Sequence, residues 1–347
     1  MTGDAGHLRL ARPPRKKDGG RRHAHNYYLL GMRRADAGAG EEARTHLRRA
    51  LDFDPAFLPA LRALADLEAG AGDYPAAERW LRQALDAAGP NADLYFHLGN
   101  VALNRNDPRR ALETYRQAEA LADATPELRF NIGLAYLFMG ASAEAETAFT
   151  ALTLEQPANA RVWDALGCAR RQRDDAAGAE AAFVKALELD PALNDARDHL
   201  AQLLMETPDL RRAQRVLEGA LQREPERRSS LHLLGMVYAA SHDYAAAAAC
   251  WQRLVDLGQA SPEAYQSLAA AALHLGDRAR AGAALTEMLL LYPDHAQGHV
   301  QLGLLLLDEG ESADGWQHLE TAALLAPGDP TVRQALATAR ALLARRR

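Results

Sequence analysis

Apolar residues recur along the chain at the spacing of helices that bury one face, and short polar stretches separate the blocks. In 160–191, Val162 and Leu166 fall one helical turn apart on a single face. The polar run 170–175 follows, and a second amphipathic stretch ends at Pro191, since proline stops a helix at the residue before it. The pattern predicts two short helices joined by a tight turn.

The same pattern recurs with a period of 34 residues. Leucine or isoleucine fills the seventh place of every unit, and glycine or alanine fills the eighth. A helical hairpin of this size cannot bury its apolar face alone, so successive hairpins are expected to stack into an array. Counted from the first alanine of the periodic region, nine units begin at residues 24, 58, 92, 126, 160, 194, 228, 262 and 296.

These positions resemble the tetratricopeptide repeat (TPR) family, whose pattern of small, aromatic and proline residues has the same period. The unit 160–191 matches that pattern at Trp163, Leu166, Gly167, Ala179, Phe183, Ala186 and Pro191. The resemblance covers 24–329. It implies an all-α fold, a right-handed α-solenoid of nine helical hairpins whose first helices line a concave groove.

Two segments flank the repeats. Residues 1–23 show no sustained period and carry seven basic and two acidic residues, which predicts a flexible basic arm. Two interpretations stay open for it: a solubilising or misassigned start, or a contact for anionic lipid, nucleic acid or the acidic body. Residues 330–347 carry an apolar stripe and five arginines, which predicts a C-terminal capping helix with a basic tail.

Charge and composition narrow the class of protein. The formal net charge is −6, and because both flanks are basic, the body 24–329 carries −16. Such a body repels phosphate, so no nucleic acid is expected along it. The two cysteines and the lack of a signal-peptide pattern predict a cytoplasmic protein. The excess of arginine over lysine predicts a bacterial source. Membrane contact is considered only for residues 1–23.

The groove predicts a binding surface for a peptide or protein. Asparagine side chains offer a donor and an acceptor to a peptide backbone, and aromatic side chains offer apolar pockets. The candidate partner-binding residues are the groove-facing places of the third to seventh units: Phe96, His97, Asn100, Phe130, Asn131, Leu134, Arg161, Asp164, Cys168, Arg171, Asp198, His199, Gln202, His232 and Met236. A simpler interpretation is that Phe96 and Phe130 only pack against neighbouring helices.

Three of these residues, Asn100, Asn131 and Arg161, resemble the carboxylate clamp of heat-shock chaperone adaptors. Phe96 and Ala165 depart from that clamp, because basic residues stand there in the family. Asn131 also resembles one member of the asparagine ladder of the O-linked N-acetylglucosamine transferase superhelix, but the ladder is not continued. The resemblance therefore leaves the chemistry of the partner open.

No arrangement of residues favours catalysis. His295 and His299 lie four apart without a third ligand at a known spacing, and Cys168 lies beside Arg170 and Arg171 without a nucleophile motif. We expect no enzyme activity, no cofactor and no metal.

The sequence therefore predicts a non-catalytic scaffold or adaptor that binds a peptide or protein in its groove and helps to assemble a multiprotein complex. Two alternatives stay open. One is a regulatory or substrate-docking subunit of a separate enzyme such as a glycosyltransferase. The other is an assembly factor for a secretion, pilus or envelope complex.

Overall fold

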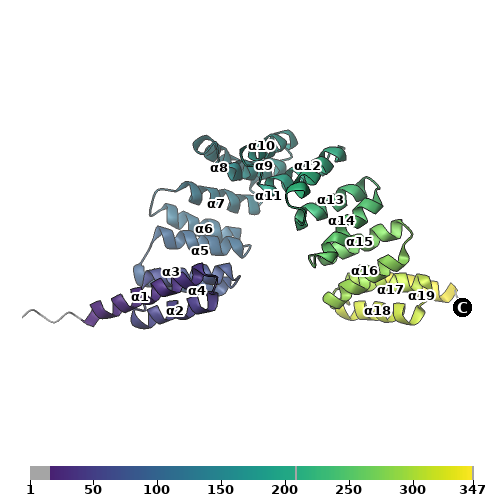
Figure 1. Cartoon of the computed structure of the whole chain (residues 1–347), viewed down its shortest axis with the longest axis horizontal. Helices are drawn as coiled ribbons and strands as arrows, with labels where there is room; N and C mark the ends of the chain where they lie inside the picture. The colour runs from purple at the N-terminus through teal and green to yellow at the C-terminus, as the bar shows by residue number, and fades with distance from the viewer. Residues whose placement is uncertain (1–15, 208, 346–347) are drawn as a thin grey trace, which may run out of the picture. The chain divides into compact units, whose positions relative to one another are not determined.

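A computed structural model of the protein describes residues 16–207 and 209–345, and these form nineteen α-helices without a β-strand. They fall into two compact units that divide between Asp175 and Ala176, and within each unit the helices stack in antiparallel pairs (Figure 1). The first unit contains α1 (Lys16–Asp36), α2 (Gly40–Phe53), α3 (Leu58–Gly70), α4 (Tyr74–Ala88), α5 (Ala92–Asn104), α6 (Pro108–Glu119), α7 (Pro126–Phe138), α8 (Ser142–Glu155) and α9 (Ala160–Gln172).

The second unit has the same build. It contains α10 (Ala176–Leu189), α11 (Asn194–Met205), α12 (Leu210–Arg223), α13 (Arg228–Ala240), α14 (Tyr244–Asp256), α15 (Pro262–His274), α16 (Arg278–Leu291), α17 (Ala296–Glu309), α18 (Ser312–Leu325) and α19 (Pro330–Arg345). The odd-numbered helices from α3 to α17 begin at the residues where the sequence period begins, from Leu58 to Ala296.

The first helix departs from the sequence prediction. α1 begins at Lys16 rather than at Ala24, so 16–23 are helical and do not belong to an irregular arm. The turn of sequence before Ala24 holds no proline and only two glycines, and Gly20 packs against the carbonyl of Phe53 at the end of α2. The remainder of the predicted arm, 1–15, lies outside the described residues.

A left-handed residue turns eight of the nine hairpins. The fifteenth place has a positive φ in every unit except the sixth, where Pro208 lies outside the described residues, because the chain must reverse tightly between the two helices. Glycine fills it in five units, as at Gly72 (φ 81°), whereas Asn106, Asp174 and His242 adopt the same conformation near 60°. Asparagine and aspartate tolerate this region better than other residues. Aspartates such as Asp73 then cap the second helix, accepting from the backbone N–H three residues on.

Close helix contact explains the small residue at the eighth place. A Cβ on Gly99 would lie 2.2 Å from the ring of Tyr115, and one on Gly133 would lie 2.7 Å from the ring of Phe149. Both rings are fully buried. The small residue on the first helix and the ring on the second therefore fit into one another and fix the distance between the two backbones.

Ion pairs join the second helix of one repeat to the next repeat. The buried Glu78 of α4 pairs with Arg105 at 2.6 Å and with Arg110, both in the following repeat, and with Arg82 of its own helix at 2.5 Å. The carboxylate therefore holds three guanidinium groups, and it fixes how the third repeat sits on the second.

The same place of other repeats makes an equivalent pair. Glu146 of α8 pairs with Arg170 at 3.1 Å and with Arg173, and the hydrogen bond from Arg173 lowers the pKa of Glu146. In the first repeat the signs are reversed, since Arg44 of α2 pairs with the buried Glu68 of α3 at 3.0 Å.

The last helix, α19, packs on α17 and α18. Val332, Ala335 and Ala339 are buried against Leu307 and Leu319. We infer that α19 closes the apolar end of the array, as terminal elements of solenoids do.

Candidate functional site

A cleft of about 420 Å³ lies in the first unit, between α5, α7 and the start of α9. Five residues predicted from the sequence line it: Phe96, Phe130, Asn131, Leu134 and Arg161. The other lining residues are Pro126, Glu127, Gln156, Asn159 and Val162. We call this set the aromatic cleft. Its volume falls within the range of ordinary ligand pockets.

The two phenylalanines pack against neighbouring helices and also line the cleft. Phe96 packs against Tyr115 with ring centroids 6.1 Å apart, and Phe130 packs against Phe149 at 5.5 Å. Each ring is only half-buried and also lines the cleft. Packing against the second helices thus holds the rings in place, and their remaining faces give the cleft an apolar wall.

Arg161 is the exposed cation of the cleft. Its guanidinium lies 5.9 Å from the centroid of the Phe130 ring, which is within the range of a cation–π contact. The backbone N–H of Arg161 donates to Asn159 at the start of α9. Glu127 lines the same cleft from α7. The cleft therefore offers one guanidinium and one carboxylate to a ligand.

Asn100 and Asn131 bond to one another. Asn131 Nδ2 donates to Asn100 Oδ1 at 2.8 Å, and the hydroxyl of Tyr115 donates to the same oxygen at 2.7 Å. Burial raises the pKa of this hydroxyl, so it stays a donor. Within the described residues, no hydrogen bond occupies Asn131 Oδ1 or Asn100 Nδ2, so one acceptor and one donor stay available for a peptide backbone.

His97 lies outside the aromatic cleft. Its two ring nitrogens lie 3.6 Å from carboxylate oxygens of Asp66 and Asp93. Both acids line a second, larger cleft of about 640 Å³ between α1, α3 and α5. Its remaining lining residues are Tyr28, Met32, Ala35, Leu58, Pro59, Arg62, Ala63, Leu67, Asn91 and Leu94. We call this set the acidic cleft.

The candidate residues chosen from the sequence missed the acidic cleft. They begin at the third unit, whereas this cleft is formed mainly by the first two. The groove-facing places that select Phe96 and Phe130 also select Tyr28, Met32 and Arg62 in those earlier units. The signal was therefore present in the repeat pattern.

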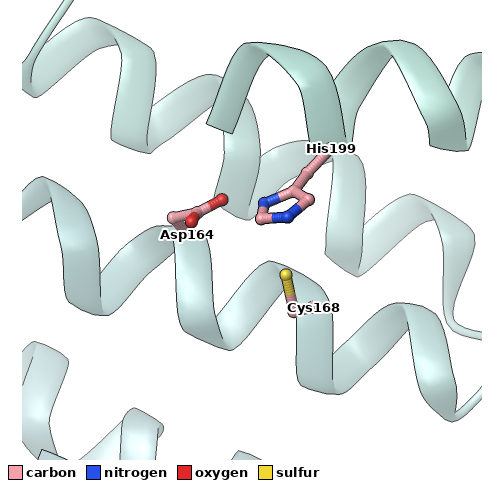
Figure 2. A group of neighbouring side chains, drawn as sticks. All are labelled: Asp164, Cys168 and His199. Carbon is pink, nitrogen blue, oxygen red and sulfur yellow. The ribbon is translucent and has the colours of Figure 1, made fainter. Parts of the chain in front are cut away.

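Three predicted residues lie further along α9. Asp164 and Cys168 are one turn apart on the same side of α9 (Figure 2) and are half-buried, as is Arg171. They do not line the aromatic cleft. The neighbouring Arg170 pairs with Glu146 at 3.1 Å. One of the two guanidinium groups considered from the sequence beside the Cys168 thiol, that of Arg170, therefore serves an inter-repeat ion pair.

Asp198 of α11, in the second unit, is buried and hydrogen-bonded. Its carboxylate is only 7% exposed and accepts from Arg227 at 2.8 Å, from Ser229 at 2.6 Å and from Ser230 at 3.0 Å. These donors come from the start of the following repeat. The carboxylate of Asp198 is therefore buried under that repeat and bonded to its donors, and its predicted role in partner binding stays a prediction.

The other predicted residues of the second unit are spread over α11 and α13. His199 of α11 (Figure 2) packs against Phe183 with ring centroids 5.7 Å apart, and Gln202 is half-buried on the same helix. His232 lines a small cleft of about 270 Å³, and burial lowers its pKa. Met236, one turn further along α13, is exposed. Of these four residues, only His232 is among the lining of that small cleft.

The two histidines considered as metal ligands have other partners. His295 caps α17, where its Nδ1 accepts from the backbone N–H of Gly298 at 3.0 Å. His299 Nδ1 lies 2.8 Å from His318 Nδ1, and His299 Nε2 donates to the carbonyl of Pro293 at 2.9 Å.

None of the helices in the described parts of the chain is both long and apolar enough to cross a bilayer.

Comparisons with known proteins match the repeats. A family model described as the TPR domain of cytochrome c-type biogenesis protein H matches residues 150–265, and one described as a tetratricopeptide repeat matches residues 96–138. The heat-shock protein cognate co-chaperone sgt12 of Aspergillus fumigatus is 31% identical over 101 residues, which are 29% of this chain and 30% of that protein. The human protein O-mannosyl-transferase TMTC3 is 25% identical over 281 residues, 79% of this chain and 31% of that protein. The matches thus span less than a third of either relative.

Solved structures agree on the fold. A tetratricopeptide repeat protein from Parabacteroides merdae has a TM-score of 0.61 at 17% identity, covering 71% of this chain and 98% of that one. PilW, a type IV pilus biogenesis factor, has a TM-score of 0.56 at 17% identity, covering 61% of this chain and 98% of PilW. The 34-residue period, the paired helices and these matches lead to one conclusion: the chain is a tetratricopeptide repeat protein with an α-solenoid fold.

Proposed function

We propose that the protein is a non-catalytic scaffold that binds an extended peptide segment of a partner protein in the aromatic cleft. The observation that carries this proposal is the unused hydrogen-bonding capacity of Asn100 and Asn131 beside two half-exposed phenylalanine rings. A peptide backbone needs a donor and an acceptor, and each such bond contributes about 1 kcal/mol net. The rings of Phe96 and Phe130 provide the apolar surface that a side chain of the peptide would bury.

The geometry also disfavours a carboxylate clamp. Asn100 Oδ1 is taken by Tyr115 and Asn131, and Arg161 lies over the Phe130 ring. A terminal carboxylate would meet one cation with Glu127 in the same cleft. An internal segment of a partner suits this arrangement better than a free C-terminus.

Affinity purification with mass spectrometry from the native organism tests the proposal. The chain with Phe130→Ala and Asn131→Ala should lose the partner that the unmodified chain retains, while its helical circular dichroism stays unchanged. A chain with Phe138→Ala and Asn104→Ala is the matched control, because it removes the same residue types at exposed positions outside the cleft. Retention of the partner by the first variant would move the interface elsewhere.

A second candidate is an assembly factor for an envelope or secretion complex, in which the groove holds one component while others join. The match of residues 150–265 to the TPR domain of a cytochrome c-type biogenesis protein favours it. The same purification separates the two, since an assembly factor should retain several components of one complex in a cleft-dependent way. Retention of a single soluble enzyme would instead support a docking subunit.

A further inference from the structure

The acidic cleft combines an apolar floor with charged residues at its edge. Tyr28 and Met32 of α1, Leu58 and Leu67 of α3, and Leu94 of α5 are among its lining residues. At about 640 Å³ it is larger than the aromatic cleft. It has room for a large aliphatic or aromatic side chain, which would remove apolar surface from water on both partners.

One carboxylate at this edge, that of Asp66, has no guanidinium partner among the described residues. Arg62 Nη1 donates to Asp93 at 2.6 Å, so this acid is neutralised by a guanidinium. Asp66 accepts no hydrogen bond from the described residues. The imidazole of His97 lies 3.6 Å from each acid, which is too long for a hydrogen bond. The edge therefore presents a half-exposed carboxylate to a ligand.

The two clefts are neighbours on one helix. Phe96 lines the aromatic cleft, and the next residue, His97, contacts the acids of the second cleft. Their rings lie 5.6 Å apart in an edge-to-face arrangement. An extended segment that fills the aromatic cleft between α5 and α9 can therefore continue over α5 to the acidic cleft.

We propose that the acidic cleft selects partner segments in which a large apolar side chain stands next to lysine or arginine. The apolar side chain enters the floor, and the cation pairs with Asp66. The inference rests on the proposed function, since it names a further subsite for the same peptide. Charge complementarity carries it: a segment with glutamate or aspartate at this point would meet a second negative charge.

The test uses the full chain and immobilised arrays of short peptides. Each peptide carries a large apolar residue followed by lysine, glutamine or glutamate, and is otherwise identical. The unmodified chain should retain the lysine peptides best at low salt. Asp66→Asn should reduce that preference about two- to five-fold, the range of one exposed ion pair, and Asp66→Lys should transfer it to the glutamate peptides.

A gain of binding offers an independent check. Arg62→Gln frees the carboxylate of Asp93, so retention of lysine peptides should rise by a similar two- to five-fold. Loss of a merely structural ion pair would not produce this gain. Asp52→Asn on α2 is the matched control, since it removes an exposed acid that lines neither cleft and should change nothing.

The outcomes separate the inference from the proposed function. Peptide retention that needs Phe130 and Asn131 but ignores Asp66→Asn would overturn the inference and leave the aromatic cleft in place. Absence of any retained peptide in the array would count against both. If Arg9→Gln with Arg12→Gln in the chain's own basic segment raises retention, that segment occupies the cleft, and the proposal of a separate partner fails.

Discussion

The ring of Tyr115 lies across the backbone of Gly99 so closely that a Cβ atom there would sit 2.2 Å from the ring. Trp251 lies in the same way over Gly235, where the distance is 2.7 Å. Where the second helix carries leucine instead of a ring, alanine can replace the glycine, as in the pair Ala65 and Leu81. A ring on the second helix therefore always faces a glycine, whereas leucine faces alanine in three repeats and glycine in two.

Gly99→Ala should destabilise the protein by about 1–3 kcal/mol, because the added methyl group overlaps the buried ring. Adding Tyr115→Leu should recover part of this loss, since it recreates the alanine–leucine pair of the second repeat. Urea unfolding of both single variants and the double variant measures the coupling.

Gly70→Ala serves as the control, since a Cβ there meets no other atom within 4 Å. It should be neutral or slightly stabilising. Equal losses for Gly99→Ala with and without Tyr115→Leu would contradict the close-packing argument.

Asp198→Ala should cost about 3 kcal/mol, because it leaves Arg227 and Ser230 without the buried carboxylate that both contact. Asp195→Asn is a matched control on the same guanidinium. The side chain of Asp195 is 74% exposed and lies 3.0 Å from Arg227, so its loss should cost less than about 1 kcal/mol. Thermal or urea unfolding distinguishes the two, and similar losses would refute a buried role for Asp198.

Glu78→Gln should destabilise the junction between the second and third repeats by about 1–3 kcal/mol, because three arginines then converge on a neutral group. Added salt should restore part of the loss, since it screens repulsion between the guanidinium groups. Glu113→Gln, an exposed change in the neighbouring helix, should have little effect. A loss that salt does not reduce would argue against charge repulsion as its cause.

Acid should weaken the protein through His318. Burial and the adjacent His299 lower the pKa of His318, with Asp314 opposing them. The folded pKa thus lies below the unfolded value of about 6.5. The unfolded chain then binds more protons as the pH falls, so stability is present above about pH 6.5 and is lost below it.

The loss of stability in acid follows from the short contact between His299 Nδ1 and His318 Nδ1, because the space between these two atoms holds one proton and not two. Urea midpoints at about pH 7.5 and about pH 5.5 should differ more for the unmodified chain than for His318→Gln. His232, whose pKa burial also lowers, should account for some of the remaining difference. Identical shifts in both proteins would exclude the histidine pair as the cause.

Arg161→Ala should weaken binding of peptides that carry a carboxylate beside their apolar residue by about two- to five-fold, the range of one exposed ion pair. Peptides without that charge should be affected less, because the Phe130 ring stays in place on Phe149. Peptide arrays with the two classes measure the difference. A uniform loss for all peptides would show that Arg161 supports the cleft rather than reading charge.

The repeat pattern predicts the helices well because it depends on local spacing. Helix starts from Leu58 to Ala296 follow the period, since the small residue, the ring and the capping aspartate each act within one hairpin. α1 was not predicted from Lys16, because the residues before Ala24 lack the period and still propagate the helix.

The site depends on side-chain directions that spacing does not specify. Asn100 was expected to face a peptide freely, yet Tyr115 and Asn131 use its oxygen. Asp198 was placed in the groove by its position in the unit, but Arg227 reaches it from the connection between α12 and α13. Such contacts depend on long, flexible side chains from the next repeat.

The ion pairs between repeats give the array an order. Arg44 of the first repeat requires an acid in its neighbour, whereas Glu146 of the fourth requires arginines. Duplication of the fourth repeat in place would put Glu146 opposite Tyr136 and Met139, the uncharged residues that fill the places of Arg170 and Arg173 in that repeat. The repeats thus share one shape but differ in the charged residues at their junctions. Adding or reordering repeats would therefore require a matching change of charge at each new junction.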